Sequence, residues 1–405
     1  MSISQLAKSI PDSPTLRLNQ VAKELRDRGE AVIHLGGGEP KSKVPSDAII
    51  SAASKLNSAE IRYTPSDGTV AMKKAVIRYV EDNYAKIVGP ENIIVSNGAK
   101  QSLSVLLQAI VDPQDEVVIL APYWVSYPEM IKICYGKPVV VTPESGRFEP
   151  KMEEIEAAIS SYTKAIIVNS PNNPSGAIFS EKLIAELVQF CEKKDIYLIM
   201  DDIYHKLIFD GRTVPSPYQF EKVNAEKSKL VVVNGVSKLY AMTGFRIGWA
   251  VANPKVVEAM TNIQSQTTSC PSALLQSAAT AALNGVQSGV ESLRLSLENN
   301  RNIMLNELAS LEGLRIEKPA GTFYCFPDFS AFTKSSSKLS EFLLEKVKVV
   351  TVPGNEFGLE GHLRLSYCGS IKEIKEGVDR IKWALDPNSS NEIFIGDRKL
   401  VRDWS

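Results

Sequence analysis

The sequence predicts an α/β protein with a large domain on a mostly parallel β-sheet and a smaller α+β domain. Its 405 residues exceed the roughly 250–300 residues that one hydrophobic core usually spans, so two domains are expected. The middle of the chain alternates runs of β-branched residues with segments of helical periodicity. Such runs are typical of parallel strands that helices cover on both faces.

Short apolar runs predict the strands of the large sheet. They are residues 92–96, 116–120, 138–142, 165–169, 196–200 and 230–233. In parallel sheets of this kind, ligands bind at the carboxyl ends of the strands. Side chains that directly follow these runs are therefore the first candidates for a functional site.

Apolar stripes with helical spacing lie between several of these runs. They predict helices over residues 100–111, 151–160 and 180–194. A longer pattern over 290–311 predicts a helix of about 33 Å, long enough to link two domains. Beyond it, residues 313–329, 346–353 and 362–367 predict strands of the smaller domain. Residues 386–391 form a predicted loop, and the tail 392–405 shows no core face.

Composition excludes several classes of protein. The net charge of −1 gives no reason to expect nucleic acid or an anionic membrane as a partner. No apolar run approaches 18 residues, and the start lacks a signal region, so a cytoplasmic protein is expected. The five cysteines are scattered and do not cluster with the three histidines. We therefore expect neither a disulfide framework nor a metal site.

A lysine and an arginine at a short spacing carry the strongest chemical signal. Ser237-Lys238 follows the strand at 230–233, and Arg246 comes eight residues after the lysine. A lysine amine can form a Schiff base with an aldehyde, and an arginine can hold a phosphate. The pair therefore points to pyridoxal phosphate, an aldehyde cofactor with its own phosphate. The alternative is two solvated charges in a polar loop.

Further segments supply the other parts of such a site. Asn97-Gly98-Ala99-Lys100 joins a strand to a helix, where backbone N–H groups favour an anion. Asp201 ends a strand, and a buried carboxylate needs a cation such as the protonated pyridine nitrogen. Tyr204 could donate to the ring oxygen of the cofactor. The neighbouring Asp202 is expected to be a solvated or capping residue.

Two more segments contain side chains that could bind a substrate. Residues 170–176 are rich in proline and asparagine and follow a strand, which turn chemistry explains in part. Arg364 lies in an apolar strand, where its guanidinium group needs an anion such as a carboxylate. A structural ion pair is the alternative for that arginine.

Taken together, these segments resemble the signature motifs of class I aminotransferases, pyridoxal-phosphate enzymes of fold type I. The motifs follow the order of that family over about three-quarters of the chain, at residues 63–68, 96–101, 122–128, 169–176, 201–204, 237–248 and 363–367. The sequence is most similar to the prokaryotic aspartate aminotransferase branch. This resemblance implies a seven-stranded sheet in the large domain and amino-acid and 2-oxo-acid substrates.

The resemblance also implies roles for particular residues. Lys238 would bind the cofactor and move the proton. Asp201 would pair with the pyridine nitrogen, and Tyr204 and Asn173 would hold the ring oxygen. Arg246, with the backbone around Gly98, Ala99 and Lys100, would bind the phosphate, and Ser237 would also contact the cofactor. Trp124 would stack on the ring, and the substrate would meet the set Gly38, Lys100, Trp124, Asn173 and Arg364.

Domain boundaries and assembly follow from the same resemblance. It implies an N-terminal arm (1–14), a first part of the small domain (15–45), a large cofactor-binding domain (46–289), and an interdomain helix with the rest of the small domain (290–405). Tyr63 would reach the phosphate in a neighbouring subunit, so the protein is expected to be a homodimer with shared active sites.

Two points qualify the choice of substrate and reaction. Members that use prephenate carry a lysine near the start, but Pro11 stands at that place and Lys8 is out of register. This departure argues against prephenate. The expected activity is transfer of an amino group from L-aspartate to 2-oxoglutarate by a ping-pong mechanism. Alternatives are an aromatic or alanine aminotransferase, a C–S β-lyase or decarboxylase on the same fold, and a ligand-sensing domain.

Overall fold

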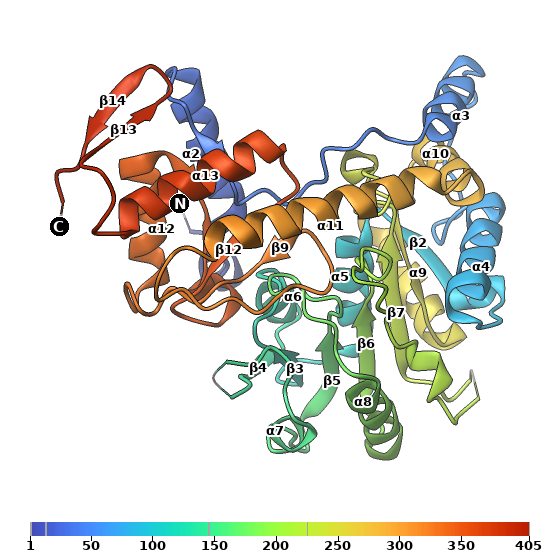
Figure 1. Ribbon diagram of the computed structural model, residues 1–405. Coiled ribbons are helices and arrows are strands. Elements are labelled where there is room, and N and C mark those ends of the chain that lie inside the picture. The colour runs from blue at the N-terminus through green and yellow to red at the C-terminus, as the bar shows by residue number, and fades with distance from the viewer. Residues whose placement is uncertain (1, 13, 145, 225, 405) are drawn as a thin grey trace.

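A seven-stranded sheet forms the centre of the larger part of the molecule (Figure 1). The computed structural model describes residues 2–12, 14–144, 146–224 and 226–404. The strands in spatial order are β2 (Ile93–Ser96), β8 (Gly248–Val251), β7 (Leu230–Gly235), β6 (Tyr197–Asp201), β5 (Thr163–Val168), β3 (Glu116–Leu120) and β4 (Lys137–Val141). Within this sheet β8 runs opposite to the other six strands, so the predicted, mostly parallel sheet is confirmed.

Helices cover both faces of this sheet, as the continuous apolar runs predict. Along β5, Ile166 and Val168 belong to one apolar cluster, whereas Ala165 and Ile167 belong to another. This alternation is the period of a strand that is buried on both sides. The helices of this part are α3 (Ser46–Asn57), α4 (Val70–Tyr84), α5 (Ala99–Ile110), α6 (Tyr127–Ile133), α7 (Met152–Glu156), α8 (Glu181–Lys194), α9 (Pro254–Thr267) and α10 (Ala273–Asn284).

The smaller part is built from short strands and helices from both ends of the chain. Strand β1 (Ile33–His34) pairs in parallel with β10 (Val349–Val350). Strand β12 (Leu363–Ser366) lies between β9 (Tyr324–Cys325) and β11 (Val352–Pro353). The helices are α1 (Gln5–Ser9), α2 (Pro14–Asp27), α12 (Ser336–Val347) and α13 (Ile371–Leu385). The domain boundaries at residues 14, 45 and 289 stay a prediction.

The long helix α11 (Ser288–Leu308) runs between the two parts, as the periodicity over 290–311 predicts (Figure 1). Its Arg301 is fully buried and donates two hydrogen bonds of 2.8 Å to the Asp210 carboxylate in the larger part. The same guanidinium donates to the Pro319 carbonyl at 2.9 Å. A paired buried charge of this kind fixes the helix against both neighbours.

Three local predictions are wrong or incomplete. The helix expected over 151–160 ends at Glu156, and only β9 forms a strand within 313–329. The tail is not featureless: β13 (Glu392–Ile395) and β14 (Arg398–Val401) form a hairpin. Trp404 then packs edge-on against Trp383 of α13 and Phe342 of α12. In the described residues, no helix is long and apolar enough to cross a membrane.

Candidate active site

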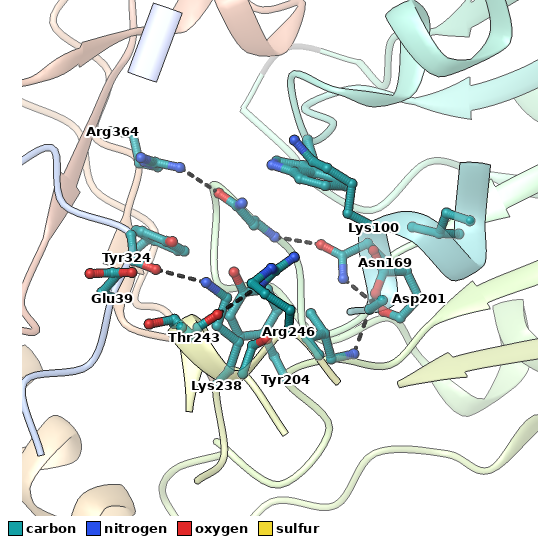
Figure 2. A pocket seen from close by; sticks show the side chains of 18 of the residues that line it. Glu39, Lys100, Asn169, Asp201, Tyr204, Lys238, Thr243, Arg246, Tyr324 and Arg364 are labelled. Carbon is teal, nitrogen blue, oxygen red and sulfur yellow. Dashed lines mark hydrogen bonds between the residues drawn. The ribbon is translucent and has the colours of Figure 1, made fainter. Parts of the chain in front are cut away.

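A cavity of about 540 Å³ lies where the carboxyl ends of the parallel strands meet the smaller part of the molecule (Figure 2). Residues from both parts of the chain line it, and most of the predicted site residues are among them. These are Gly38, Ala99, Lys100, Trp124, Asn173, Asp201, Tyr204, Ser237, Lys238, Arg246 and Arg364. Segments that are far apart in sequence therefore meet at one site.

Lys238 follows β7 and points across the cavity toward the smaller part. Its Nζ donates a hydrogen bond of 2.8 Å to the carbonyl of Gly38. The pKa of this amine is lowered to about 8, chiefly by burial; Glu39 opposes this shift, and the positive charges of Arg364 and Arg246 contribute to it. A free amine is thus more abundant here than on a solvated lysine, as a nucleophile or base requires.

Asp201 is the last residue of β6 and is buried. Its Oδ2 accepts a hydrogen bond of 2.6 Å from the Tyr127 hydroxyl, and burial raises its pKa to about 6. Tyr204 is buried three residues later and lines the same cavity. Asp202 is not solvated as predicted: it is 1% exposed, and its Oδ2 accepts from the Tyr84 hydroxyl at 3.0 Å. A tyrosine from another element thus covers each of the two carboxylates, Asp201 and Asp202, and no pattern in the sequence indicates this.

The turn before α5 forms a cradle beside Arg246. Gly98 has φ = +91°, and a Cβ at this position would come within 2.5 Å of the Arg246 guanidinium. Arg246 itself is held by a bond of 2.8 Å from Nη1 to the Thr243 carbonyl. A Cβ at Gly248 would collide with the Ala99 backbone. Glycine therefore lets the first N–H groups of α5 and one guanidinium approach each other, as an anion site requires.

Arg364 lies on the opposite side of the cavity and is 2% exposed. Its guanidinium donates to Asn173 Oδ1 at 3.0 Å and to the Gly36 carbonyl at 2.9 Å. The rings of Tyr324 and Phe357 lie 4.3 and 5.1 Å from its central carbon. Its Nε has no hydrogen-bond partner in the described part of the chain. A buried guanidinium with a spare donor fits a carboxylate.

Lys100 and Trp124 lie together on the large-sheet side of the cavity. The Lys100 Nζ is 4.9 Å from the centre of the Trp124 ring, a cation–π distance. Burial lowers the pKa of Lys100, and the nearby Arg246 lowers it further. Trp124 also packs edge-on against Tyr127, with ring centres 5.4 Å apart. The tryptophan is thus held beside the cavity by contacts on both sides.

Tyr63 is the one predicted residue that lies well away from this cavity. It is 91% exposed and lines a separate hollow beside α3 and α10. Within one subunit the structure therefore does not bring Tyr63 to the site.

Sequence reasoning missed several residues that line or support the cavity. Asn169 Nδ2 donates to the Asp201 carbonyl at 2.8 Å, and its Oδ1 accepts from the Asn173 N–H at 2.7 Å. Glu39 and Tyr324 also line the cavity. Asn169 could have been found, because it follows a predicted strand at the start of the 169–176 motif. Tyr324 gives no such signal, since it lies within the apolar run Phe323 to Phe326.

The donor set fits the predicted cofactor. A lysine amine with a lowered pKa, a buried carboxylate and an anion cradle line one cavity with a flat aromatic ring. These groups match the aldehyde, the ring nitrogen, the phosphate and the ring face of pyridoxal phosphate. No group of His, Cys, Asp and Glu side chains in the described residues could hold a metal ion.

Comparison with known proteins gives the same result. The model of the family "Aminotransferase class I and II" matches residues 30–381. Aspartate aminotransferase from Bacillus subtilis (strain 168) is 38% identical over 96% of this chain and 100% of its own length. A probable aspartate/prephenate aminotransferase from Aquifex aeolicus (strain VF5) is 37% identical over 92% and 96%.

Solved structures agree with this result. Aspartate aminotransferase from Thermus thermophilus with maleate superposes with a TM-score of 0.90 at 35% identity, and the match covers 94% of this chain and 99% of that one. The described fold, the cavity and these matches lead to one conclusion. The chain belongs to the class I and II aminotransferases and is a pyridoxal-phosphate-dependent enzyme of fold type I.

Proposed function

We propose that this enzyme moves the amino group of L-aspartate to 2-oxoglutarate in two half-reactions at one site. The observation that carries the proposal is a pair of cations, Arg364 and Lys100, that line the same cavity as Lys238. A dicarboxylic substrate needs one cation for each carboxylate, and a charged hydrogen bond favours each contact. The relatives named aspartate aminotransferase support this choice. Prephenate is not included, because Pro11 stands in place of the lysine.

The residues around Lys238 would hold the cofactor. Lys238 would bind it through Nζ, Asp201 would keep a proton on its ring nitrogen, and Tyr204 and Asn173 would contact its ring oxygen. Its phosphate would be held by Gly98, Ala99, Lys100, Ser237 and Arg246. Once bound, pyridoxal phosphate supplies a carbonyl for the amino group and a ring that withdraws electrons from the substrate Cα.

The proton transfer would belong to Lys238. Its Nζ, which would be freed when the substrate amine replaces it, would take the proton from the substrate Cα, because the lowered pKa leaves part of the amine unprotonated near neutral pH. Arg364, with Asn173 and Gly38 beside it, would orient the α-carboxylate. Trp124 would exclude water from one face of the site. Lys100 would bind the distal carboxylate and so select dicarboxylic substrates.

The product assay tests this proposal directly. The holoenzyme with L-aspartate and 2-oxoglutarate should yield glutamate and oxaloacetate in equal amounts. With L-aspartate alone it should release one oxaloacetate per site and then stop, as a ping-pong mechanism requires. Release of ammonia or carbon dioxide in place of glutamate would instead show a lyase or a decarboxylase.

We also propose that the active form is a homodimer in which Tyr63 of the partner subunit completes each phosphate site. The exposed Tyr63 belongs to a stretch of the chain with other exposed apolar residues, on α3, in the segment before α4 and at the start of α4. They are Ile49, Ile50, Leu56, Ile61 and Val70. A patch of this kind on a polar surface is typical of a subunit interface. A cytoplasmic location is part of the same proposal, and the five free thiols fit a reducing compartment.

Mixing two inactive variants tests the shared site. A heterodimer of Tyr63→Phe and Lys238→Ala subunits has one site with both changes and one site with neither. Activity above that of both parent variants is therefore expected after subunit exchange. A fully active monomer in light scattering, or no recovery on mixing, would contradict the proposal.

A further inference from the structure

Two adjacent buried aspartates at the end of β6 each accept a hydrogen bond from a tyrosine. Tyr127 donates to Asp201 Oδ2 at 2.6 Å, and Tyr84 donates to Asp202 Oδ2 at 3.0 Å. Both tyrosines are buried. Only Asp201 lines the cavity, so the two pairs are chemically alike but differ in their access to a ligand. This likeness provides an internal control for the role of Tyr127.

The surroundings of Asp201 disfavour its ionised form. Burial raises the pKa of the carboxyl to about 6, and the Tyr127 hydrogen bond is the largest opposing influence. Tyr127 and Lys238 lower the pKa of this carboxyl, and its own negative charge raises the pKa of Asp202 and of Tyr204. A donor at 2.6 Å stabilises the anion at Oδ2, and the Ile203 N–H donates to Oδ1 at 3.4 Å.

Tyr127 also touches the ring beside the cavity. Its ring lies edge-on to Trp124, at an interplanar angle of 87°. The same side chain therefore contacts a residue proposed for the ring face of the cofactor and the carboxylate proposed for its nitrogen. Removal of the hydroxyl alone would separate these two contacts, because the ring packing stays.

We propose that Tyr127 is a positioning residue that keeps Asp201 ionised and so sets the affinity of the site for the protonated ring nitrogen of the cofactor. The inference rests on the proposed function, because it acts through the role assigned to Asp201. Tyr127 itself does not line the cavity. Its hydroxyl therefore acts on the cofactor through the Asp201 carboxylate, whereas its ring contacts Trp124.

The test measures cofactor affinity in the absence of substrate. The apoprotein is titrated with pyridoxal 5′-phosphate and binding is followed by absorbance. Tyr127→Phe should weaken binding about tenfold, the usual scale for loss of one hydrogen bond to a charged group. Tyr84→Phe is the matched control and should leave affinity unchanged. Circular dichroism and thermal unfolding verify that both variants fold.

A double-mutant cycle shows whether Tyr127 acts through Asp201. In the Asp201→Asn background, Tyr127→Phe should have little further effect on affinity, since the carboxylate is already lost. The tenfold deficit of the single variant should grow as the pH falls from 8 to 6, because Asp201 without its donor takes up a proton more readily. A loss of packing would give additive effects and a deficit that does not depend on pH, and either result overturns the inference.

Failure of the proposed function gives a different pattern. If the wild-type protein does not bind pyridoxal 5′-phosphate, or if Asp201→Asn leaves its affinity unchanged, the assignment of Asp201 is wrong. If wild type binds and Asp201→Asn weakens binding while Tyr127→Phe does not, only the role of Tyr127 is wrong.

Discussion

The two sides of the cavity are built in different ways. On the large-sheet side, Asp201 and Lys238 stand at or within three residues of a strand end, so the sheet fixes them locally. On the other side, Arg364 is held by bonds to Gly36 and Asn173, which lie 328 and 191 residues away in the sequence. The side proposed to bind the cofactor is therefore preformed by one sheet, whereas the side proposed to bind the substrate depends on contacts between distant segments.

The largest expected effect is on the cofactor side. Lys238→Ala should abolish transamination, because loss of proton transfer alone costs about 10²–10⁴-fold. The variant should still fold and bind the cofactor without a covalent bond, since the other contacts of the large-sheet side remain. Turnover, the absorbance of the covalent form and mass spectrometry after borohydride reduction measure these effects. Substantial turnover would remove Lys238 from the mechanism.

A smaller loss is expected on the substrate side. Arg364→Ala should lower kcat/KM about 100-fold, since a charged hydrogen bond contributes about 1.5–3 kcal/mol. Cofactor affinity should change much less than kcat/KM, because Arg364 contacts the proposed cofactor residues through Asn173. Arg364→Lys is the control that keeps the charge but loses the fork. Equal loss of cofactor affinity in Arg364→Ala would show that the two sides are not independent.

Lys100 tests whether the two sides have separate roles, because it lies on the large-sheet side but is proposed to bind substrate. Lys100→Ala should lower kcat/KM about 10- to 150-fold for aspartate and glutamate. Alanine and phenylalanine lack the distal carboxylate and should lose little. The four substrates are assayed in parallel. The same loss on all of them would assign Lys100 to cofactor binding alone.

The smallest expected effect is a shift in pH dependence. With the Lys238 pKa near 8, covalent capture of pyridoxal 5′-phosphate by the apoprotein should speed up about tenfold per pH unit below 8 and level off above it. Glu39→Gln removes a negative charge that raises this pKa, so the midpoint should move to lower pH. Stopped-flow absorbance measures the rates. A midpoint near that of free lysine, about 10.4, would contradict the burial argument.

The sequence predicts the large-sheet side better than the substrate side for a physical reason. Strands such as β5 and β6 are local, and their β-branched runs place Asn169 and Asp201 at one sheet edge. The bond between Tyr127 and Asp201 joins residues 74 apart, and that between Arg364 and Gly36 joins residues 328 apart. No periodicity encodes such contacts.

The prediction for the tail 392–405 failed for a different reason, because the sequence does contain a signal for a hairpin there. Gly396 has φ = +59° between two short runs of apolar and polar residues, which is typical of a tight hairpin turn. The burial of Asp202, by contrast, had no local signal. It depends on Tyr84 from a helix 118 residues earlier in the chain.

The hairpin has a practical consequence for anyone who handles this protein. Arg398 of β14 pairs with Glu30 at 2.9 Å, just before β1 and the glycine-rich loop that accepts bonds from Arg364 and Lys238. Trp404 is anchored on α12 and α13. The carboxyl end is thus a poor place for an affinity tag or a truncation, because either would disturb the contacts of this segment with Glu30, α12 and α13.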